Sequence, residues 1–251
     1  MGTGITGEPL FALEGETKAL ATTAGYIAVK PHWHEVKMYC ESQWRLALSP
    51  ALMHAIYYDA SAGTYADYTT IATDRLSTTH VPLDAMDNAP ADYLYLGFSN
   101  PVLGVYVDIG TNANANTATL DVEYCSTAVP GTIAFTNVAS DSDGTDSGGA
   151  TLAVDGVYTW TLPGSSWVRS TLGTSSAPLY SKCYWIRFTP SADLSATVDL
   201  NNIIPVYQNT TYGYMEPGVE YQFSLRETLC GGFVVTATAG TPTLNITWVK
   251  H

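Results

Sequence analysis

Apolar residues recur at every second position through much of the chain between residues 92 and 206. The alternation is clearest at 103–109, 118–124 and 158–162, where Ala, Leu, Val, Ile or aromatic residues on one side alternate with Gly, Thr, Asp, Glu and one Tyr, Tyr106, on the other. A period of two is that of a β-strand with one buried face. We therefore predict a central antiparallel β-sandwich over residues 92–207.

Shorter segments of the same kind occur toward both ends of the chain. They lie at 26–29, 35–40, 44–48 and 54–58, and again at 219–225, 233–238 and 244–248. The three C-terminal segments are too few to bury two faces by themselves, so they need a partner sheet. We predict a second sandwich, formed by residues 21–91 together with 208–251, with the central sandwich inserted between its halves.

Composition supports this fold class. The chain has 17 Tyr and 21 Gly, many Thr and Val, and no long segment rich in Leu, Lys and Glu. Residues of these types favour strands and turns over helices. The prediction is an all-β protein with two jelly-roll-like β-sandwich domains and little or no helix.

Two stretches lack a sustained period. Residues 1–20 are rich in Gly and Thr and poor in apolar side chains, so they are predicted to form a flexible arm that becomes ordered only on a neighbour. Residues 59–91 are polar and contain Gly63, Pro82 and Pro90, which indicates a long connection. Connections of that length in a compact protein usually cover or bind something.

Charge narrows the choice of partners. Ten Lys and Arg against 23 Asp and Glu give a formal charge of −13. Such a surface repels phosphate backbones and anionic lipid, and no apolar run approaches the roughly 20 residues of a membrane-spanning helix. We expect neither nucleic acid nor a membrane as a partner.

The four cysteines, Cys40, Cys125, Cys183 and Cys230, lie singly and without the C-x-x-C spacing of zinc or redox sites. Residues 1–10 have neither the basic nor the apolar region of a signal peptide. We expect reduced, buried thiols, and two disulfides in one of three connectivities remain the alternative.

Two groups of residues could bind a metal. His32 and His34 form an H-x-H pair, which a strand places on one face, but no third ligand lies nearby. Asp141, Asp143 and Asp146 surround Gly144 as in calcium loops, without the terminal Glu of an EF-hand. We predict no metal site, and calcium at the aspartate loop remains the alternative to a solvated acidic turn.

The sequence also lacks a recognisable catalytic motif. There is no G-x-S-x-G elbow, and the five His residues lie away from any motif-like Ser or Cys. Neither Gly148-Gly149 nor Gly231-Gly232 has the context of a phosphate loop. We predict no catalytic residue and no cofactor. A pair of glycosidase carboxylates, which is recognised only by its separation in space, remains an alternative.

Aromatic residues are the more informative feature. They sit in strands or at strand ends, where a flat ring can stack on a sugar or anchor a protein interface. Ordinary packing is the alternative, because aromatic residues are common in strands. The candidates are Tyr93, Tyr95, Tyr106, Trp167 and Trp185.

As text, the central region resembles a module found in virion structural proteins of tailed bacteriophages. The resemblance rests on D-Y-L-Y-L-G at 92–97, G-V-Y-V-D-I-G at 104–110, L-D-V-E-Y at 120–124, T-W-T-L-P at 159–163, Y-W-I-R-F at 184–188 and L-N-I-T-W-V-K at 244–250. It covers about half the chain well, and none of the matched residues is catalytic in such proteins. It implies a non-enzymatic capsid decoration or cement protein, assembled in the host cytoplasm, whose partner is the major capsid protein. A carbohydrate-binding or receptor-binding tail-associated protein is the alternative.

Assembly gives a final prediction. Two open sandwiches leave edge strands that must be covered or charged, and a closed ring of subunits covers one edge per chain. We predict a homotrimer whose N-terminal arm, residues 1–20, lies on a neighbouring subunit or on the capsid.

Overall fold

The structure, a computed structural model, is all-β, which confirms the predicted fold class. It describes residues 12–22, 25–28, 33–74, 78–83, 86–129, 132–173, 180–207, 213–224 and 230–250. Residues 1–11 of the predicted arm, His32 of the H-x-H pair and the side chain of Cys230 lie outside the described part. Among the described residues the helical elements are α1 (Thr69–Asp74) and the single 3₁₀ turn η1 (Gly164–Ser166).

The chain divides into two units. The first unit comprises residues 1–48 and 211–251, and the second comprises residues 49–210. Each unit has its own hydrophobic core, so each is described by itself.

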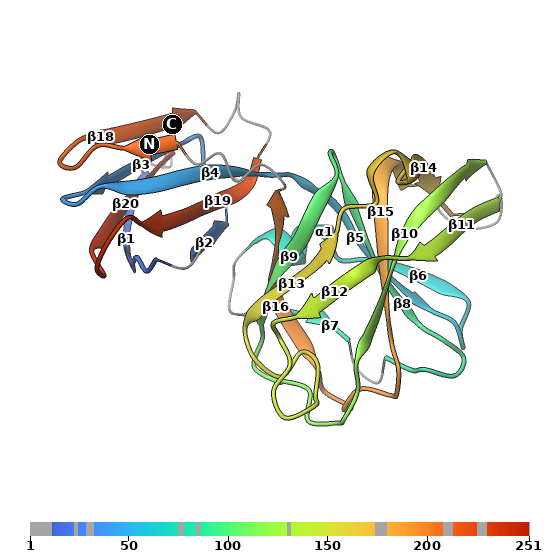
Figure 1. Cartoon of the computed structure of the whole chain (residues 1–251). Helices are drawn as coiled ribbons and strands as arrows, with labels where there is room; N and C mark the ends of the chain where they lie inside the picture. Colours follow the sequence, from blue (N-terminus) through green and yellow to red (C-terminus); the bar gives the residue numbers. More distant parts are fainter. Residues whose placement is uncertain are drawn as a thin grey trace, which may run out of the picture. The chain divides into compact units, whose positions relative to one another are not determined.

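The first unit contains two four-stranded sheets, each of which takes strands from both ends of the chain (Figure 1). One sheet has the order β1 (Ala12–Ala19), β20 (Thr243–Lys250), β3 (Glu35–Cys40) and β18 (Glu220–Ser224), paired antiparallel. The other has the order β17 (Gly213–Met215), β4 (Trp44–Pro50), β19 (Cys230–Ala237) and β2 (Gly25–Ala28).

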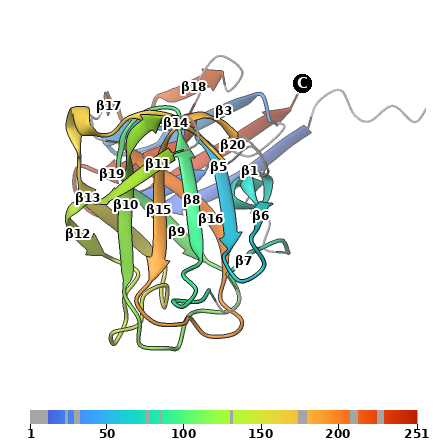
Figure 2. The ribbon, with the colours of Figure 1, turned by 90° about the vertical axis from the view of Figure 1, so that its right-hand side faces the viewer.

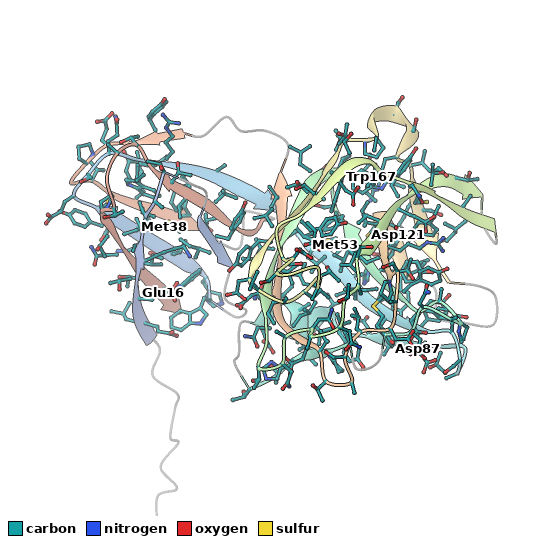
Figure 3. All side chains as sticks on the ribbon, turned by 60° about the horizontal axis from the view of Figure 1, so that its bottom comes forward. Glu16, Met38, Met53, Asp87, Asp121 and Trp167 are labelled. Carbon is teal, nitrogen blue, oxygen red and sulfur yellow. The ribbon has the colours of Figure 1, made fainter. Side chains whose placement is uncertain are left out.

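The core of this unit follows the alternation in the sequence. Val36, Met38 and Cys40 of β3 are buried, and the residues between them are partly exposed. Met38 lies inside the unit (Figure 3), with Trp44 and Trp248 also fully buried. The predicted pairing of N-terminal with C-terminal strands is therefore present in β3, β18 and β20.

The second unit is a sandwich of two larger sheets (Figure 2). The seven-stranded sheet has the order β11 (Thr132–Asn137), β10 (Leu120–Val129), β15 (Tyr180–Pro190), β8 (Tyr93–Phe98), β5 (Leu52–Asp59) and β6 (Thr64–Asp67), with β14 (Arg169–Leu172) also paired to β15. The five-stranded sheet has the order β12 (Ala139–Asp143), β13 (Gly156–Thr161), β9 (Val102–Ile109), β16 (Asp199–Tyr207) and β7 (Val81–Pro82).

The inner faces of these sheets share one core. Leu94, Leu96 and Phe188 of the larger sheet meet Val105 and Val107 of the smaller one around a small apolar pocket. Because side chains in a strand alternate between faces, the neighbours of these residues point away from the core. The outer face of the seven-stranded sheet is thereby defined, and it is turned toward the viewer in Figure 2.

The predicted domain boundaries were partly wrong. Residues 21–91 do not act as one half of the terminal sandwich, because β5 pairs with β8 and β6 pairs with β5 inside the second unit. The stretch 59–91 is no simple connection, since it contains β6, α1 and β7. The segment 12–19 of the predicted arm is a strand, β1, held in register along the whole of β20 of the same chain.

Candidate binding surface

Aromatic side chains gather on the outer face of the seven-stranded sheet. We call this group the aromatic face, and its members are Tyr58, Tyr65, Tyr93, Tyr95, Phe135 and Tyr180. They come from β5, β6, β8, β11 and β15, so rigid strands position every ring. Tyr95 is 6% exposed and the other five are half-buried.

Strand register sets one row of this face. Tyr58 of β5 lies opposite Tyr65 of β6 on one side and opposite Tyr93 of β8 on the other. The ring centroids are 4.6 Å apart for Tyr58 and Tyr65, and 6.3 Å apart for Tyr58 and Tyr93. Adjacent strands are about 4.8 Å apart, so the three rings span a platform of about 10 Å across the strands. Directly opposed aromatic pairs also stabilise the sheet itself.

A glycine shapes another row of the same face, which is separated from the first by the row that contains Ile56 and Tyr95. Gly97 of β8 lies between His54 of β5 and Trp185 of β15 in the register. Because Gly97 has no side chain, the His54 and Trp185 rings meet above it and stack, with centroids 5.5 Å apart at an interplanar angle of 17°. The Trp185 indole nitrogen donates to the Ser170 carbonyl at 2.7 Å, and its ring is fully buried.

One arginine joins the aromatic face from β15. The Arg187 guanidinium lies 4.2 Å from the Tyr93 ring centroid and 4.5 Å from that of Phe135. Its Nε donates to the Glu123 carboxylate, its cross-strand partner in β10. Cation–π contacts of this kind favour rings held flat against the guanidinium. The ion pair therefore holds the Arg187 guanidinium against the two rings, and the Glu123 carboxylate neutralises its charge.

Burial keeps three tyrosines of this face protonated and neutral. Burial raises the pKa of Tyr65, Tyr95 and Tyr180 above the usual range of a phenol. Burial also lowers the pKa of His54, against a smaller opposing effect of the Asp67 charge. Near neutral pH these groups carry no charge, and the phenol groups both donate and accept hydrogen bonds.

His54 also forms a Ser–His pair that the sequence did not reveal. Its Nε2 lies 2.6 Å from the Ser181 hydroxyl, but its Nδ1 is buried and has no hydrogen-bond partner among the described residues. A nucleophilic serine needs a base that a third group orients. The pair supplies two of these three parts, and we assign it no chemistry.

The three aspartates of the predicted calcium loop lie near a fourth aspartate, which belongs to β10. Asp121, Asp141, Asp143 and Asp146 line one shallow hollow with Tyr158, and Asp121 is labelled in Figure 3. Two of these aspartates accept hydrogen bonds from neighbouring groups. Asp143 accepts them from the backbone N–H and the hydroxyl of Thr145, and Asp141 accepts one from the Tyr158 hydroxyl. Within the described residues no three His, Cys, Asp or Glu side chains gather as metal ligands.

The aromatic residues singled out from the sequence have separate fates. Trp167 and Trp185 are 3% and 0% exposed, and Trp167 donates its indole N–H to the Trp185 carbonyl, so both are packing residues. Tyr93 and Tyr95 belong to the aromatic face. Tyr106 is half-buried on β9 of the other sheet. The sequence thus found two of the six members of the face and missed the four whose neighbours are set by strand pairing.

The remaining predicted groups are more ordinary. Cys40, Cys125 and Cys183 are buried free thiols, as predicted, and burial raises the pKa of Cys125 and Cys183. The His34 backbone N–H donates to the Val249 carbonyl. No helix in the described part of the chain is long and apolar enough to cross a membrane.

Comparison with known proteins adds no relative. No protein-family model, no curated protein and no solved structure matches the chain.

Proposed function

We propose that this chain is a non-enzymatic virion structural protein that decorates the outer surface of a tailed-phage head and binds the major capsid protein. The all-β fold and the resemblance of residues 92–207 to phage virion modules support the proposal. In this role the protein acts by adding buried interface between capsid subunits, which requires no reacting group.

One structural observation carries the proposal: the second unit is an insertion within the first. Both described chain ends, β1 and β20, belong to the first unit, and residues 49–210 form a separate sandwich with its own core. A protein built this way can anchor one unit on a particle and display the other. We assign anchoring to the first unit and display to the second.

The edges of the first unit suit anchoring. β1 and β18 are the two outermost strands of their sheet, and each pairs with a single described strand. Leu13 of β1 is 70% exposed, and Val219, next to β18, is 43% exposed. An open strand edge with exposed apolar side chains is a template for pairing with another chain.

These two edges also support the proposed homotrimer. β1 and β18 run antiparallel in the order of the sheet, so β18 of one subunit can extend the sheet at β1 of the next. A head-to-tail interface of this kind closes into a ring when the rotation allows it. Light scattering should report about three times the 26.9 kDa of one chain, and a monomer would contradict the trimer.

The attachment proposal can be tested on capsids that lack the protein. We expect Leu13→Asp to lower occupancy on such capsids roughly tenfold, because a charge on β1 disfavours pairing at that edge. We expect removal of residues 1–11 to have a similar effect, because the N-terminal arm is proposed to lie on a neighbouring subunit or on the capsid. Val154→Asp is the matched control, since Val154 is 43% exposed in the second unit. Full attachment of both first-unit variants, or an equal loss for the control, would contradict the assignment of anchoring to the first unit.

A second candidate function is carbohydrate or receptor binding by a tail-associated protein. The specific observation that favours it is the aromatic face, which is a ligand-sized platform on a displayed unit. The chemistry of this face does not depend on where the protein sits on a particle.

A further inference from the structure

We infer that the aromatic face of the second unit is a binding site for a neutral glycan. The site is the row of Tyr65, Tyr58 and Tyr93, flanked by Tyr180 and by Phe135 with Arg187. The inference does not depend on the virion proposal, because it uses only contacts within one sheet.

The position of these rings is the first argument. One face of an antiparallel sheet normally packs on the core while the other carries polar residues toward water. Here Leu94 and Leu96 of β8 face the core, and Tyr93 and Tyr95 of the same strand face outward among further tyrosines. Tyrosine offers a flat apolar ring and a polar hydroxyl, which is the combination that a sugar, with its apolar ring face and hydroxyl rim, requires.

Preorganisation is the second argument. Each ring of the row touches another ring, and the strand register fixes their order. Tyrosine has few rotatable bonds, so little further side-chain entropy is lost when a ligand binds. A braced row of this kind gains more from stacking than isolated surface tyrosines do.

Charge selects a neutral ligand. Among the described residues, Arg187 is the cation that lies over rings of the aromatic face, and Glu123 already pairs with it. Asp67 lies next to the face on β6, close enough to affect the pKa of His54 and of Tyr180, and the whole chain carries a formal charge of −13. Sulfated, phosphorylated or sialylated ligands would therefore meet an unfavourable field. The hydroxyl groups of Tyr65 and Tyr180 stay protonated and can bind sugar hydroxyls.

Size favours a small ligand over a protein. An aromatic side chain offers about 200 Å² of surface, and each of the five partly exposed rings shows no more than about a third of it. The face therefore offers at most about 330 Å² of aromatic surface, well below the ~800 Å² per partner of a stable protein interface. That area suits an oligosaccharide of a few units.

The experiment measures binding of the full chain to soluble hexasaccharides by calorimetry. Cellohexaose, maltohexaose and chitohexaose serve as neutral probes, and a heparin hexasaccharide serves as the anionic probe, with a glycan array to widen the neutral set. We expect at least one neutral glycan to bind and the heparin probe not to bind. Binding of anionic glycans alone, or of no neutral glycan on the array at millimolar concentration, would overturn the inference.

Variants locate the site. We expect Tyr65→Ala and Tyr93→Ala each to weaken neutral-glycan binding roughly tenfold, about 1.4 kcal/mol, while Tyr65→Phe keeps most of it. Tyr106→Ala is the matched control, because Tyr106 is also a half-buried tyrosine, on a strand of the other sheet. A loss in the control equal to that in the Tyr65 and Tyr93 variants would place the ligand elsewhere and overturn the inference.

A measurement on the unmodified protein covers the case in which an alanine variant does not fold. Backbone amide NMR with the neutral glycan should shift signals of β5, β6 and β8 and leave those of β3 and β20 in place. Shifts confined to the first unit would contradict the site. Failure of this inference can be distinguished from failure of the virion proposal. Capsid attachment can be lost while glycan binding persists, and glycan binding can be lost while capsid attachment persists.

Discussion

Gly97 is the position where a single added methyl group should reveal how the outer face is built. A Cβ atom on Gly97 would lie 2.9 and 3.0 Å from two ring carbons of Trp185 and 3.2 Å from the Cys183 Cβ. The first distance is shorter than real Cβ contacts allow, so an atom must move. Trp185 has little freedom to do so, because it is fully buried, stacked on His54 and hydrogen-bonded through Nε1.

The expected effect of Gly97→Ala follows from two opposing contributions. Overpacking a well-packed site costs about 1–3 kcal/mol. Replacing glycine by alanine in a strand returns about 0.4–1 kcal/mol by restricting the unfolded chain. We expect a net loss of about 1–2 kcal/mol, which lowers the melting temperature of a unit of this size by about 2–8 °C.

Urea denaturation and calorimetry of the full chain would measure this change. Gly15→Ala is a suitable control, since Gly15 lies in the edge strand β1 and a Cβ there meets one backbone oxygen at 4.0 Å. In a double-mutant cycle, Gly97→Ala should cost less in a Trp185→Phe background than in the unmodified protein, because phenylalanine lacks the clashing ring carbons. An unchanged or raised stability of Gly97→Ala, equal to that of Gly15→Ala, would refute the close contact of Trp185 with the Gly97 backbone.

Three further predictions test the surroundings of the aromatic face. Asp92→Ala should lower the free energy of unfolding by about 3 kcal/mol in urea denaturation. Buried Asp92 accepts hydrogen bonds from Tyr57 Oη, Ala60 N and Asp87 N, and the substitution would leave these three donors without an acceptor. A loss under about 1 kcal/mol would contradict this. Folding lowers the pKa of His54, so the unfolded state binds more protons than the folded state. The stability contributed by His54 should therefore be fully present above about pH 6.5 and fall as the pH drops through the folded-state pKa. The urea midpoint of His54→Gln should change less between pH 8 and 5 than that of the unmodified protein, and equal changes would contradict the assignment. A double-mutant cycle of Arg187→Met and Glu123→Gln should give a coupling of about 1 kcal/mol or more, since both side chains are largely buried; a coupling near zero would show that the pair is screened like an exposed one.

The sequence predicts individual strands well because a strand with one buried face shows a local alternation of apolar and polar residues. The alternation of Val36, Met38 and Cys40 marks β3 from end to end, and that of Val105, Val107 and Ile109 marks most of β9. No such local pattern indicates which sheet a strand joins. Residues 54–58 have the apolar and aromatic composition of a strand but no sign that their partner is β8 rather than a C-terminal strand, and the domain boundary was misplaced for this reason.

The aromatic face shows the same limit at the level of side chains. Period two correctly places Tyr93 and Tyr95 on the face opposite Leu94 and Leu96. Pairing in the sheet brings Tyr58 and Tyr65 beside them, and pairing between segments that are distant in the chain leaves no local pattern in the sequence. Trp185 also faces outward by its position in β15, yet it is buried, because Gly97 leaves room for His54 to cover it.

The most direct test of the proposed phage-head role is the position and copy number of this protein on purified tailed-phage particles from a lysate in which its gene is expressed. Quantitative mass spectrometry of intact and tail-free heads gives the copy number relative to the major capsid protein, and cryo-electron microscopy gives the position. The account predicts a copy number within a small factor of that of the major capsid protein, on the outer surface of the head, with the first unit in contact with the shell. Absence from the particle, or a few copies confined to the tail, would contradict it.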